Sequence, residues 1–524
     1  MSIRKIYELL EHCTSTCHTQ IPDRFIPTRL IDVGQHASNL PRLVLSSEIS
    51  KFEQTKYAAL SYCWGNEKDA ESQFKTEKAS LEDRRLGMPS ELMTATISDA
   101  IALTRVLSLR YLWIDALCII QDDNDDWLHE SSQMNLVYRH AFVTFCTLNS
   151  DSCHEGFLNR GPVVEVPFQS TIRSVIKGSF LVRLCPRMSH YVTRTKYRCD
   201  ANLSEWDKRC WTFQEEKMST RTLLFGSLNM HFACTRTGWS EGDEAPRPRF
   251  TLGVIEQITK FKDNRISSRD LYDSWGRLAE DYSSRLITFE KDRLSAIAGL
   301  ARMFGDALQD RYLAGHWQGD LHYGLTWCTY HHMVSRSLEA HIRNIRERDY
   351  VAPSWSWASC PRALTLNHLD TFVVEESTIV DANTDTESEH LYGQVSGGFL
   401  RIRGKMARMP HWSHARTVTW WSSGWVGMNR NCDCCVPYRF FVAIDWVQES
   451  KDAEFDILVA MLLHRLEFKD QTKPPRLRAL LLYPADELNC YYRVGVISSD
   501  GTHDGNRGMR TWFENSKEET ICIV

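Results

Sequence analysis

The chain between residues 57 and 148 alternates between apolar runs and segments whose apolar residues recur at helical spacing. Three apolar runs predict buried strands, and they cover residues 57–64, 111–120 and 141–148. Such nearly continuous apolar runs are typical of parallel strands that helices cover on both faces. We therefore expect a parallel sheet in this part of the chain.

Two segments between the apolar runs predict helices. The first begins after Pro89, and the second is capped by Asp125 or Asp126 and runs to about His140. The resulting order is β-α-β-α-β, which favours an α/β fold. Because ligands of such folds collect beyond the carboxyl ends of the strands, the loops after the first two strands are the predicted site.

The chain has 524 residues, more than the roughly 250 to 300 that one hydrophobic core usually supports. A charged, proline-rich stretch after residue 240 indicates a linker, and tryptophan-rich, strand-like stretches begin near Pro353. Four segments are predicted: an N-terminal arm at 1–56, an α/β domain at 57–240, a mostly helical connecting region at 241–350 and a β-rich C-terminal domain at 351–524.

The formal net charge of -5 provides no broad basic surface, so we expect no nucleic-acid partner. Residues 1–13 mix charged and apolar side chains, unlike a secretory signal. The most apolar stretch, 109–120, contains Arg110 and Asp115 and is too short to span a bilayer. Cys522 is third from the C-terminus, whereas prenylation requires a cysteine at the fourth position. A cytoplasmic protein without a membrane anchor is expected.

The 17 cysteines are odd in number and scattered, which suits free thiols in a reducing compartment. Cys432, Cys434 and Cys435 form the one tight cluster in the sequence. It lacks two separated Cys-x2-Cys pairs, so a zinc site and a solvent-facing thiol loop both stay open as interpretations. We predict no metal ligands and no cofactor. The sequence also contains no glycine-rich dinucleotide loop and no Walker loop.

Glu130 is the first candidate for a catalytic residue. At about 100° per residue, it falls on the same side of the second predicted helix as Met134, Val137 and Tyr138. A carboxylate that faces a core is desolvated, and its pKa rises unless it finds a partner. The alternative is that Glu130 lies in the first helical turn, where a carboxylate favours the helix dipole and reaches water or a capping amide.

Asp115 is the second candidate, because it interrupts the otherwise apolar run 111–120. A buried carboxylate at this place needs a partner. It is either part of a reactive group or a structural hydrogen-bond acceptor, and the sequence leaves both interpretations open.

Four ordered segments together resemble the heterokaryon-incompatibility (HET) family of fungi. They are Tyr57–Gly65, Tyr111–Gln121, Asp126–Trp127 followed by Met134 and Val137–Tyr138, and Arg209–Glu215 continuing to Arg221 and Phe225. Stretches 282–288, 312–315 and 353–359 look like those that follow HET domains in filamentous fungi. The chain departs from the family at Ile120, where asparagine is usual, and at Lys217, where arginine is common.

The resemblance implies an α/β HET domain with a TIR-like parallel sheet flanked by helices, followed by a mixed α/β-rich C-terminal domain. It also implies nonself recognition between fungal strains that ends in growth arrest or cell death. HET domains are remotely similar to TIR domains, some of which cleave the nicotinamide glycosidic bond of NAD+. In that comparison residues 59–64 match the first TIR strand, and Trp127–Glu130 match a tryptophan-proximal glutamate with slightly different spacing.

The predicted site follows from the wheel and the resemblance together. Glu130 and Asp115 are the predicted catalytic residues, and NAD+ is the expected substrate of such a site. A carboxylate there would hold the ribose hydroxyls and stabilise an oxocarbenium-like transition state. The predicted substrate-binding residues are Ser61, Tyr62, Trp64, Trp127 and Glu215.

Two other functions compete with NAD+ cleavage. In the first, the HET domain is a non-enzymatic death-signalling module that self-associates while the C-terminal domain recognises a protein partner. In the second, the protein is a recruited enzyme of fungal secondary metabolism with a pocket near Trp355, Trp357 or Trp420. Such tryptophans are usually core residues, which is the simpler interpretation of all three.

Overall fold

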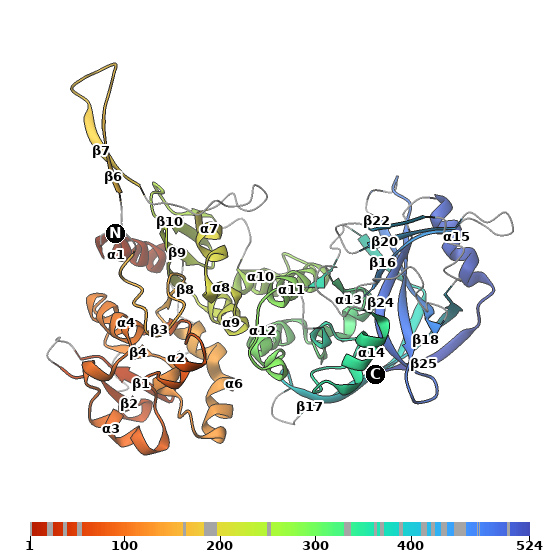
Figure 1. The fold of residues 1–524 in the computed structure, drawn as a ribbon, viewed down its shortest axis with the longest axis horizontal. Helices are drawn as coiled ribbons and strands as arrows, with labels where there is room; N and C mark the ends of the chain where they lie inside the picture. The colour runs from red at the N-terminus through yellow and green to blue at the C-terminus, as the bar shows by residue number, and fades with distance from the viewer. Residues whose placement is uncertain are drawn as a thin grey trace. The chain divides into compact units, whose positions relative to one another are not determined.

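The computed structural model describes most of the chain and divides it into two compact units, Met1–Thr259 and Lys260–Val524. Each unit is shown in Figure 1 and is treated by itself. The described residues are 3–17, 25–34, 39–49, 55–160, 164–182, 196–248, 253–329, 337–360, 364–366, 371–386, 391–409, 417–420, 425–430, 438–444, 457–468, 470, 472–499 and 503–524. Within these ranges no helix combines the length and apolarity that a bilayer crossing requires.

A sheet with the order β11-β10-β9-β8-β5-β3-β4-β1-β2 forms the centre of the first unit. Its inner four strands are mutually parallel, because β3 pairs with β4 and β5 in the same direction and β5 pairs likewise with β8. These strands are β3 (Tyr57–Ser61), β4 (Tyr111–Trp113), β5 (Val143–Cys146) and β8 (Arg221–Phe225). The predicted α/β architecture with a parallel sheet is thus confirmed.

Antiparallel strands extend this sheet on both sides. β1 (Arg29–Asp32) and β2 (Arg42–Leu45) continue it beyond β4. On the other side lie β9 (Met230–Cys234), β10 (Thr237–Ser240) and β11 (Arg247–Pro248). Residues 29–45 therefore belong to the same sheet as the segment that begins at Tyr57, although their short apolar runs gave no such indication.

The prediction of one strand over 111–120 is wrong beyond Trp113. The chain turns at Ile114 into the short helix α5 (Asp115–Cys118), and the Cys118 amide donates to the Ile114 carbonyl at 2.8 Å. The apolar residues of this run are buried in the helical turn, as they would be in a strand, so its apolarity could not distinguish the two. Asp115 consequently follows the carboxyl end of β4 instead of interrupting a strand.

The predicted second helix is confirmed as α6 (Asn124–His140). Its cap is Asp123, whose side chain accepts from the Asp125 and Asp126 amides, so the predicted cap lay two or three residues too late. The first predicted helix is α4 (Ala95–Val106). The other helices of this unit are α1 (Ile3–His12), α2 (Glu67–Glu71), α3 (Leu81–Leu86), α7 (Lys196–Asn202), α8 (Glu205–Lys208) and α9 (Cys210–Met218), and α10 (Val254–Lys262) lies at the boundary.

Antiparallel strands dominate the second unit. The pairings β22-β18-β25-β24-β23-β22 close on themselves, so these five strands share no free edge with solvent. They are β18 (Val395–Arg408), β22 (Val459–Phe468), β23 (Arg476–Pro484), β24 (Cys490–Ser499) and β25 (Glu518–Ile523). Attached strands are β16 (Thr371–Glu375), β17 (Ser377–Thr386), β19 (Thr417–Trp420), β20 (Trp425–Arg430) and β21 (Tyr438–Ile444). The main helices are α11 (Ser268–Ser283), α12 (Ala298–Leu308), α13 (Leu321–Gly324), α14 (Leu338–Glu347) and α15 (His503–Glu514).

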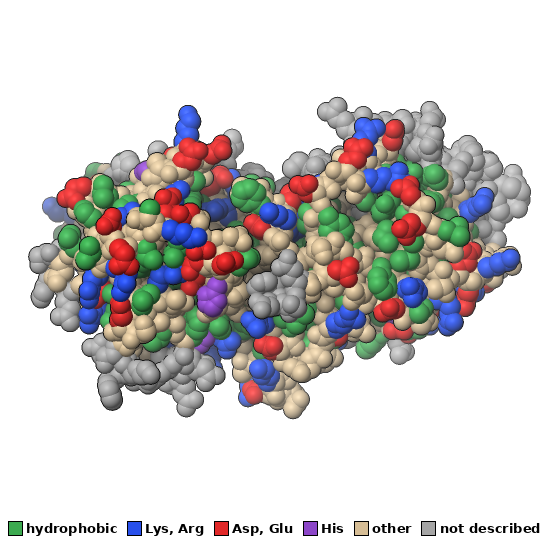
Figure 2. Space-filling model, turned by 90° about the horizontal axis from the view of Figure 1, so that it is seen from below, with side chains coloured by type: hydrophobic (Ala, Val, Ile, Leu, Met, Phe, Trp, Pro, Cys, Tyr) green, Lys and Arg blue, Asp and Glu red, His purple; other side chains and the backbone are tan. Residues whose placement is uncertain are grey.

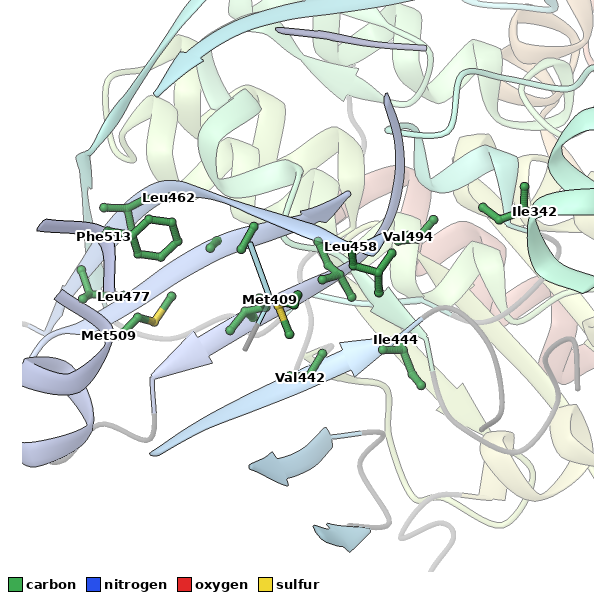
Figure 3. Packing of buried hydrophobic residues seen from close by; sticks show 14 residues of the cluster. Ile342, Met409, Val442, Ile444, Leu458, Leu462, Leu477, Val494, Met509 and Phe513 are labelled. Atoms are coloured by element: carbon green, nitrogen blue, oxygen red, sulfur yellow. The ribbon is translucent and has the colours of Figure 1, made fainter. Parts of the chain in front are cut away.

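An apolar core fills the space between these strands and α15. Figure 3 shows Met509 and Phe513 of α15 beside Leu462 of β22 and Leu477 of β23. Leu477, Ala479 and Leu481 of β23 face this core, and the residues that alternate with them are buried on the other face of the strand. Helix α15 covers the first of these two faces.

Truncation of Leu477 tests this core. Leu477→Ala is expected to lower the free energy of unfolding by about 2 to 5 kcal/mol, because it leaves a cavity among buried side chains. The matched control is Leu488→Ala, whose side chain is 92% exposed, and it should change the value by less than about 0.5 kcal/mol. Urea unfolding followed by circular dichroism gives both values, and equal losses would contradict the packing of Leu477.

Candidate functional site

The carboxyl ends of the parallel strands bring five of the seven predicted site residues to one place. Ser61 is the last residue of β3, and Tyr62 and Trp64 follow it directly. Asp115 lies two residues after β4, and Glu215 lies on α9, which precedes β8. Parallel strands end at the same edge of a sheet, and the register of β3 against β4 brings these positions together.

The Ser61 hydroxyl is the centre of the buried part of this site. It donates a short hydrogen bond to Glu215 Oε2, and it accepts one from Trp206 Nε1 at 2.8 Å. Trp206 lies in an apolar cluster with Cys63 and Cys146, which fixes the direction of its indole N–H. Ser61 thus holds the Glu215 carboxyl group against the sheet, and Trp206 in turn orients Ser61. Glu215 is only 7% exposed.

Asp115 forms the second, half-buried part. Its Oδ2 accepts from Trp64 Nε1 at 3.0 Å, and its Oδ1 accepts from the Ala116 amide at 2.7 Å. The Tyr62 hydroxyl also reaches this carboxylate and receives a hydrogen bond from Gln73 Nε2 at 2.5 Å. These contacts orient the carboxylate at the edge of the sheet while leaving it partly accessible.

The electrostatics of the site prepare a carboxyl group for proton exchange. Burial raises the pKa of Glu215 to about 7, the Ser61 hydrogen bond opposes the shift, and the nearby Asp115 charge adds to it. Burial also raises the pKa of Asp115, against the Ala116 amide and the Trp64 indole. Arg209, which donates to the Tyr62 carbonyl at 3.0 Å, supplies positive charge beside both carboxyl groups. A group with a pKa near 7 can accept or release a proton at neutral pH.

Glu130 lies in a different group of charges. As the helical wheel predicted, it faces inward, and it is 1% exposed. Its partner is Arg29 of β1, whose Nη2 is 3.3 Å from Glu130 Oε1 and also binds Asp126 at 2.5 Å. The same guanidinium donates from Nε to the Cys118 carbonyl at 2.6 Å. Burial raises the pKa of Glu130, with the Thr28 hydroxyl and Arg29 opposing the rise.

Trp127 shares this helix with Glu130, and it is half-buried at the first turn of α6. Its amide donates to the Asp123 carbonyl at 2.9 Å. Among the described contacts, none joins Trp127 or Glu130 to Ser61, Asp115 or Glu215. Glu130, which the helical wheel selected, and Trp127 are therefore separate from the five residues that the sheet edge brings together.

Four residues of the site were not predicted, and one of them is Gln73, which donates to Tyr62. Trp206 lies outside every sequence motif. Only its hydrogen bond to Ser61, which is 145 positions away in the chain, places it in the site. Arg209 begins the motif that ends at Glu215, so its position in the motif was a usable signal. Tyr138 was assigned to the apolar face of α6, yet its hydroxyl donates to the Leu60 carbonyl at 3.0 Å and reaches Glu215.

The second unit contains a cavity of about 610 Å³, lined by Trp327, His341, Ser354, Tyr492 and Arg493, among others. The predicted pocket tryptophans do not line it: Trp355 and Trp357 are fully buried core residues. The side chain of Trp420 and the cluster Cys432, Cys434 and Cys435 lie outside the described residues. On the face that Figure 2 shows, acidic and basic side chains are intermixed over the described parts of both units.

Comparison with known proteins identifies the segment that carries the site. A family model described as "Heterokaryon incompatibility protein (HET)" matches residues 57–215. No curated protein and no solved structure matches the chain. The matched segment begins with β3 and ends at Glu215, so it contains Ser61 and Asp115 as well.

The raised pKa of Glu215 predicts how stability depends on pH. The group has an ordinary pKa of 4.5 and a folded pKa of about 7, so the folded state keeps a proton that the unfolded chain has lost. The stability it contributes is complete below about pH 4.5 and is lost as pH rises through about 7. A glutamine side chain at position 215 does not titrate in this range, and its amide oxygen can still accept the hydrogen bond from Ser61.

Glu215→Gln should therefore become more stable relative to the wild type as pH rises from about 5 to about 8, by on the order of 3 kcal/mol. Urea unfolding of both proteins across this range measures the difference. A difference that does not vary with pH would show that Glu215 titrates normally.

Proposed function

Because residues 57–215 form a HET domain, we propose that this heterokaryon-incompatibility-type protein acts in nonself recognition between fungal strains, and that its response ends in cell death. The HET domain produces this response by cleaving the bond between nicotinamide and ribose in NAD+. The observation that supports this proposal is the pair of carboxyl groups, Asp115 and Glu215, at the carboxyl edge of the parallel sheet.

Cleavage of this bond releases neutral nicotinamide and leaves positive charge on the ribose ring. The leaving group needs no proton, so the protein has two tasks: to stabilise the oxocarbenium-like centre and to accept a proton from the water that attacks it. The half-buried Asp115 carboxylate is suited to the first task. Glu215, with a pKa of about 7, is suited to the second. The products are ADP-ribose, nicotinamide and one proton.

Arg209 supports the choice of a dinucleotide substrate. It is half-buried beside both carboxyl groups, and guanidinium groups pair well with phosphate oxygens. Glu130 is less suited to the reaction, because Arg29 neutralises it and Asp126 completes that group of charges. Glu130 stays in the test as the competing centre.

The test follows nicotinamide release from NAD+ by chromatography, using purified full-length protein at high concentration. Glu215→Gln should reduce the rate by about 10²- to 10⁴-fold, the usual contribution of general base catalysis. Asp115→Asn should also reduce it strongly, whereas Glu130→Gln should keep most of the rate. Circular dichroism and urea unfolding confirm that each variant is folded.

Each result has a distinct meaning. No release by folded wild-type protein would remove the enzymatic proposal. Loss of the rate in Glu130→Gln with retention in Glu215→Gln would move the reaction to the charges around Arg29. Equal rates in all three variants would exclude both sites.

A second candidate function, self-association without catalysis, is favoured by a hairpin of the first unit. β6 (Val164–Gln169) pairs with β7 (Lys177–Val182), and among the described residues neither strand pairs with a third. One face of the hairpin is apolar and exposed: it carries Val164, Val166, Phe168, Phe180 and Val182. If two copies of the chain associate through this face, each hairpin covers the apolar side chains of the other. Exposed apolar patches typically mark such interaction surfaces, and an isolated hairpin is only marginally stable in water.

Charges on this face test the second candidate. The double variant Val166→Asp with Phe180→Asp should shift the concentration dependence of sedimentation toward the monomer, because opposed carboxylates repel in a dimer. The control is Gln169→Asp with Ser179→Asp, which places the same charges on the opposite face. A wild-type protein that stays monomeric at high concentration, or equal effects of the two pairs, would contradict the hairpin interface.

A further inference from the structure

Three buried cysteines meet where the N-terminal helix of the first unit reaches the sheet. Helix α1 continues into a π-helical turn at Cys13–Cys17, and β9 ends at Cys234. The sulfur atoms of Cys13, Cys17 and Cys234 all lie within 4.8 Å of one another. Turns of this type are rare in proteins and frequently occur at functional sites. No local pattern indicates this group, because Cys17 and Cys234 are 217 positions apart in the chain.

Hydrogen-bond donors converge on these sulfur atoms. The Thr237 amide donates to Cys234 Sγ at 3.3 Å, and the Thr237 hydroxyl lies 3.3 Å from Cys234 Sγ and 3.9 Å from Cys17 Sγ. Arg221 reaches the Cys13 thiol from β8. A neutral thiol is a weak acceptor, whereas a thiolate is a strong one. Thr237 and Arg221 thus lie where they can donate to sulfur atoms that become negatively charged on binding a metal ion.

Arg221 provides a second, independent observation. Its side chain is 3% exposed, and no carboxylate forms an ion pair with it among the described residues. Its Nη1 donates to the Phe142 carbonyl at 3.2 Å, its guanidinium lies 5.3 Å from the Phe142 ring centre, and its Nε has no hydrogen-bond partner. A buried cation requires a negative partner. The Cys13 thiol, which Arg221 reaches, becomes such a partner when it is deprotonated.

We propose that Cys13, Cys17 and Cys234 bind one zinc ion as thiolates. Binding releases three thiol protons and forms three Zn–S bonds, with no change of oxidation state. Three thiolates and Zn²⁺ carry a net charge of -1, which the Arg221 guanidinium balances. Water fills the fourth position of the tetrahedral ion.

The geometry permits this ion with small movements. Zn–S bonds of about 2.3 Å place tetrahedral sulfur ligands roughly 3.8 Å apart, so the sulfur atoms need to approach by about 1 Å at most. Without metal, the contact with Cys234 and burial raise the pKa of Cys13 far above its usual value, and bound zinc reverses that preference. The ion would fasten α1 to β9, which no covalent bond does.

The first measurement is the metal content of full-length wild-type protein purified under reducing conditions without chelator. Elemental analysis should find about one zinc ion per chain, and replacement by Co²⁺ should give a thiolate-to-metal charge-transfer band. Cys17→Ser should lose the zinc and weaken that band. Cys199→Ser, which changes a half-buried cysteine outside the group, should keep both.

A stability measurement keeps the proposal falsifiable if a variant folds poorly. A zinc chelator should lower the melting temperature of the wild type and of Cys199→Ser, because metal that binds only the folded state stabilises it. Wild-type protein with three reactive thiols at these positions and no zinc would overturn the proposal. A disulfide between any two of the three, seen as a mass 2 Da lower than the reduced chain, would overturn it as well.

Discussion

The parallel pairing of β3 with β4 on one side and β5 on the other is the constraint on which the first unit depends. It makes the strands end at one edge, so residues more than 150 positions apart, such as Ser61 and Glu215, become hydrogen-bonded neighbours. It also buries both faces of β3, where all five side chains are covered. Polar groups at the end of such a strand must find partners, because water no longer reaches them.

Buried charges then determine how the surrounding elements attach. Arg29 joins the antiparallel strand β1 to α6 through Asp126 and Glu130, and it satisfies the Cys118 carbonyl at the end of α5. The Asp200 carboxylate similarly lies 2.9 Å from His231 Nε2, and it accepts hydrogen bonds from two loop amides. These groups carry their own counter-charges or donors. Glu215 instead is hydrogen-bonded by the neutral hydroxyls of Ser61 and Tyr138, and it shares the charge of Arg209 with Asp115.

The sequence predicted what periodicity and local chemistry determine. The strand–helix alternation, α6 and the inward direction of Glu130 follow from residues close together in the chain, and all three were predictable. The turn at Ile114 was not, since a fully buried run has the same apolarity as helix or strand. Partners such as Arg29, Trp206 and Cys234 are joined to their groups only by long-range contacts, so no local pattern could identify them.

Glu130 and Glu215 show why burial alone is a poor guide to reactivity. Both carboxyl groups are inward-facing and desolvated, and burial raises both pKa values. The sequence could rank them only by direction, which favoured Glu130. Their partners distinguish them: an arginine that already binds a second carboxylate holds Glu130, whereas Glu215 lies beside Asp115 and increases the negative charge at the sheet edge. Two like charges with one shared cation favour a positive group between them, and under the proposed function that group is the ribose ring as it develops positive charge.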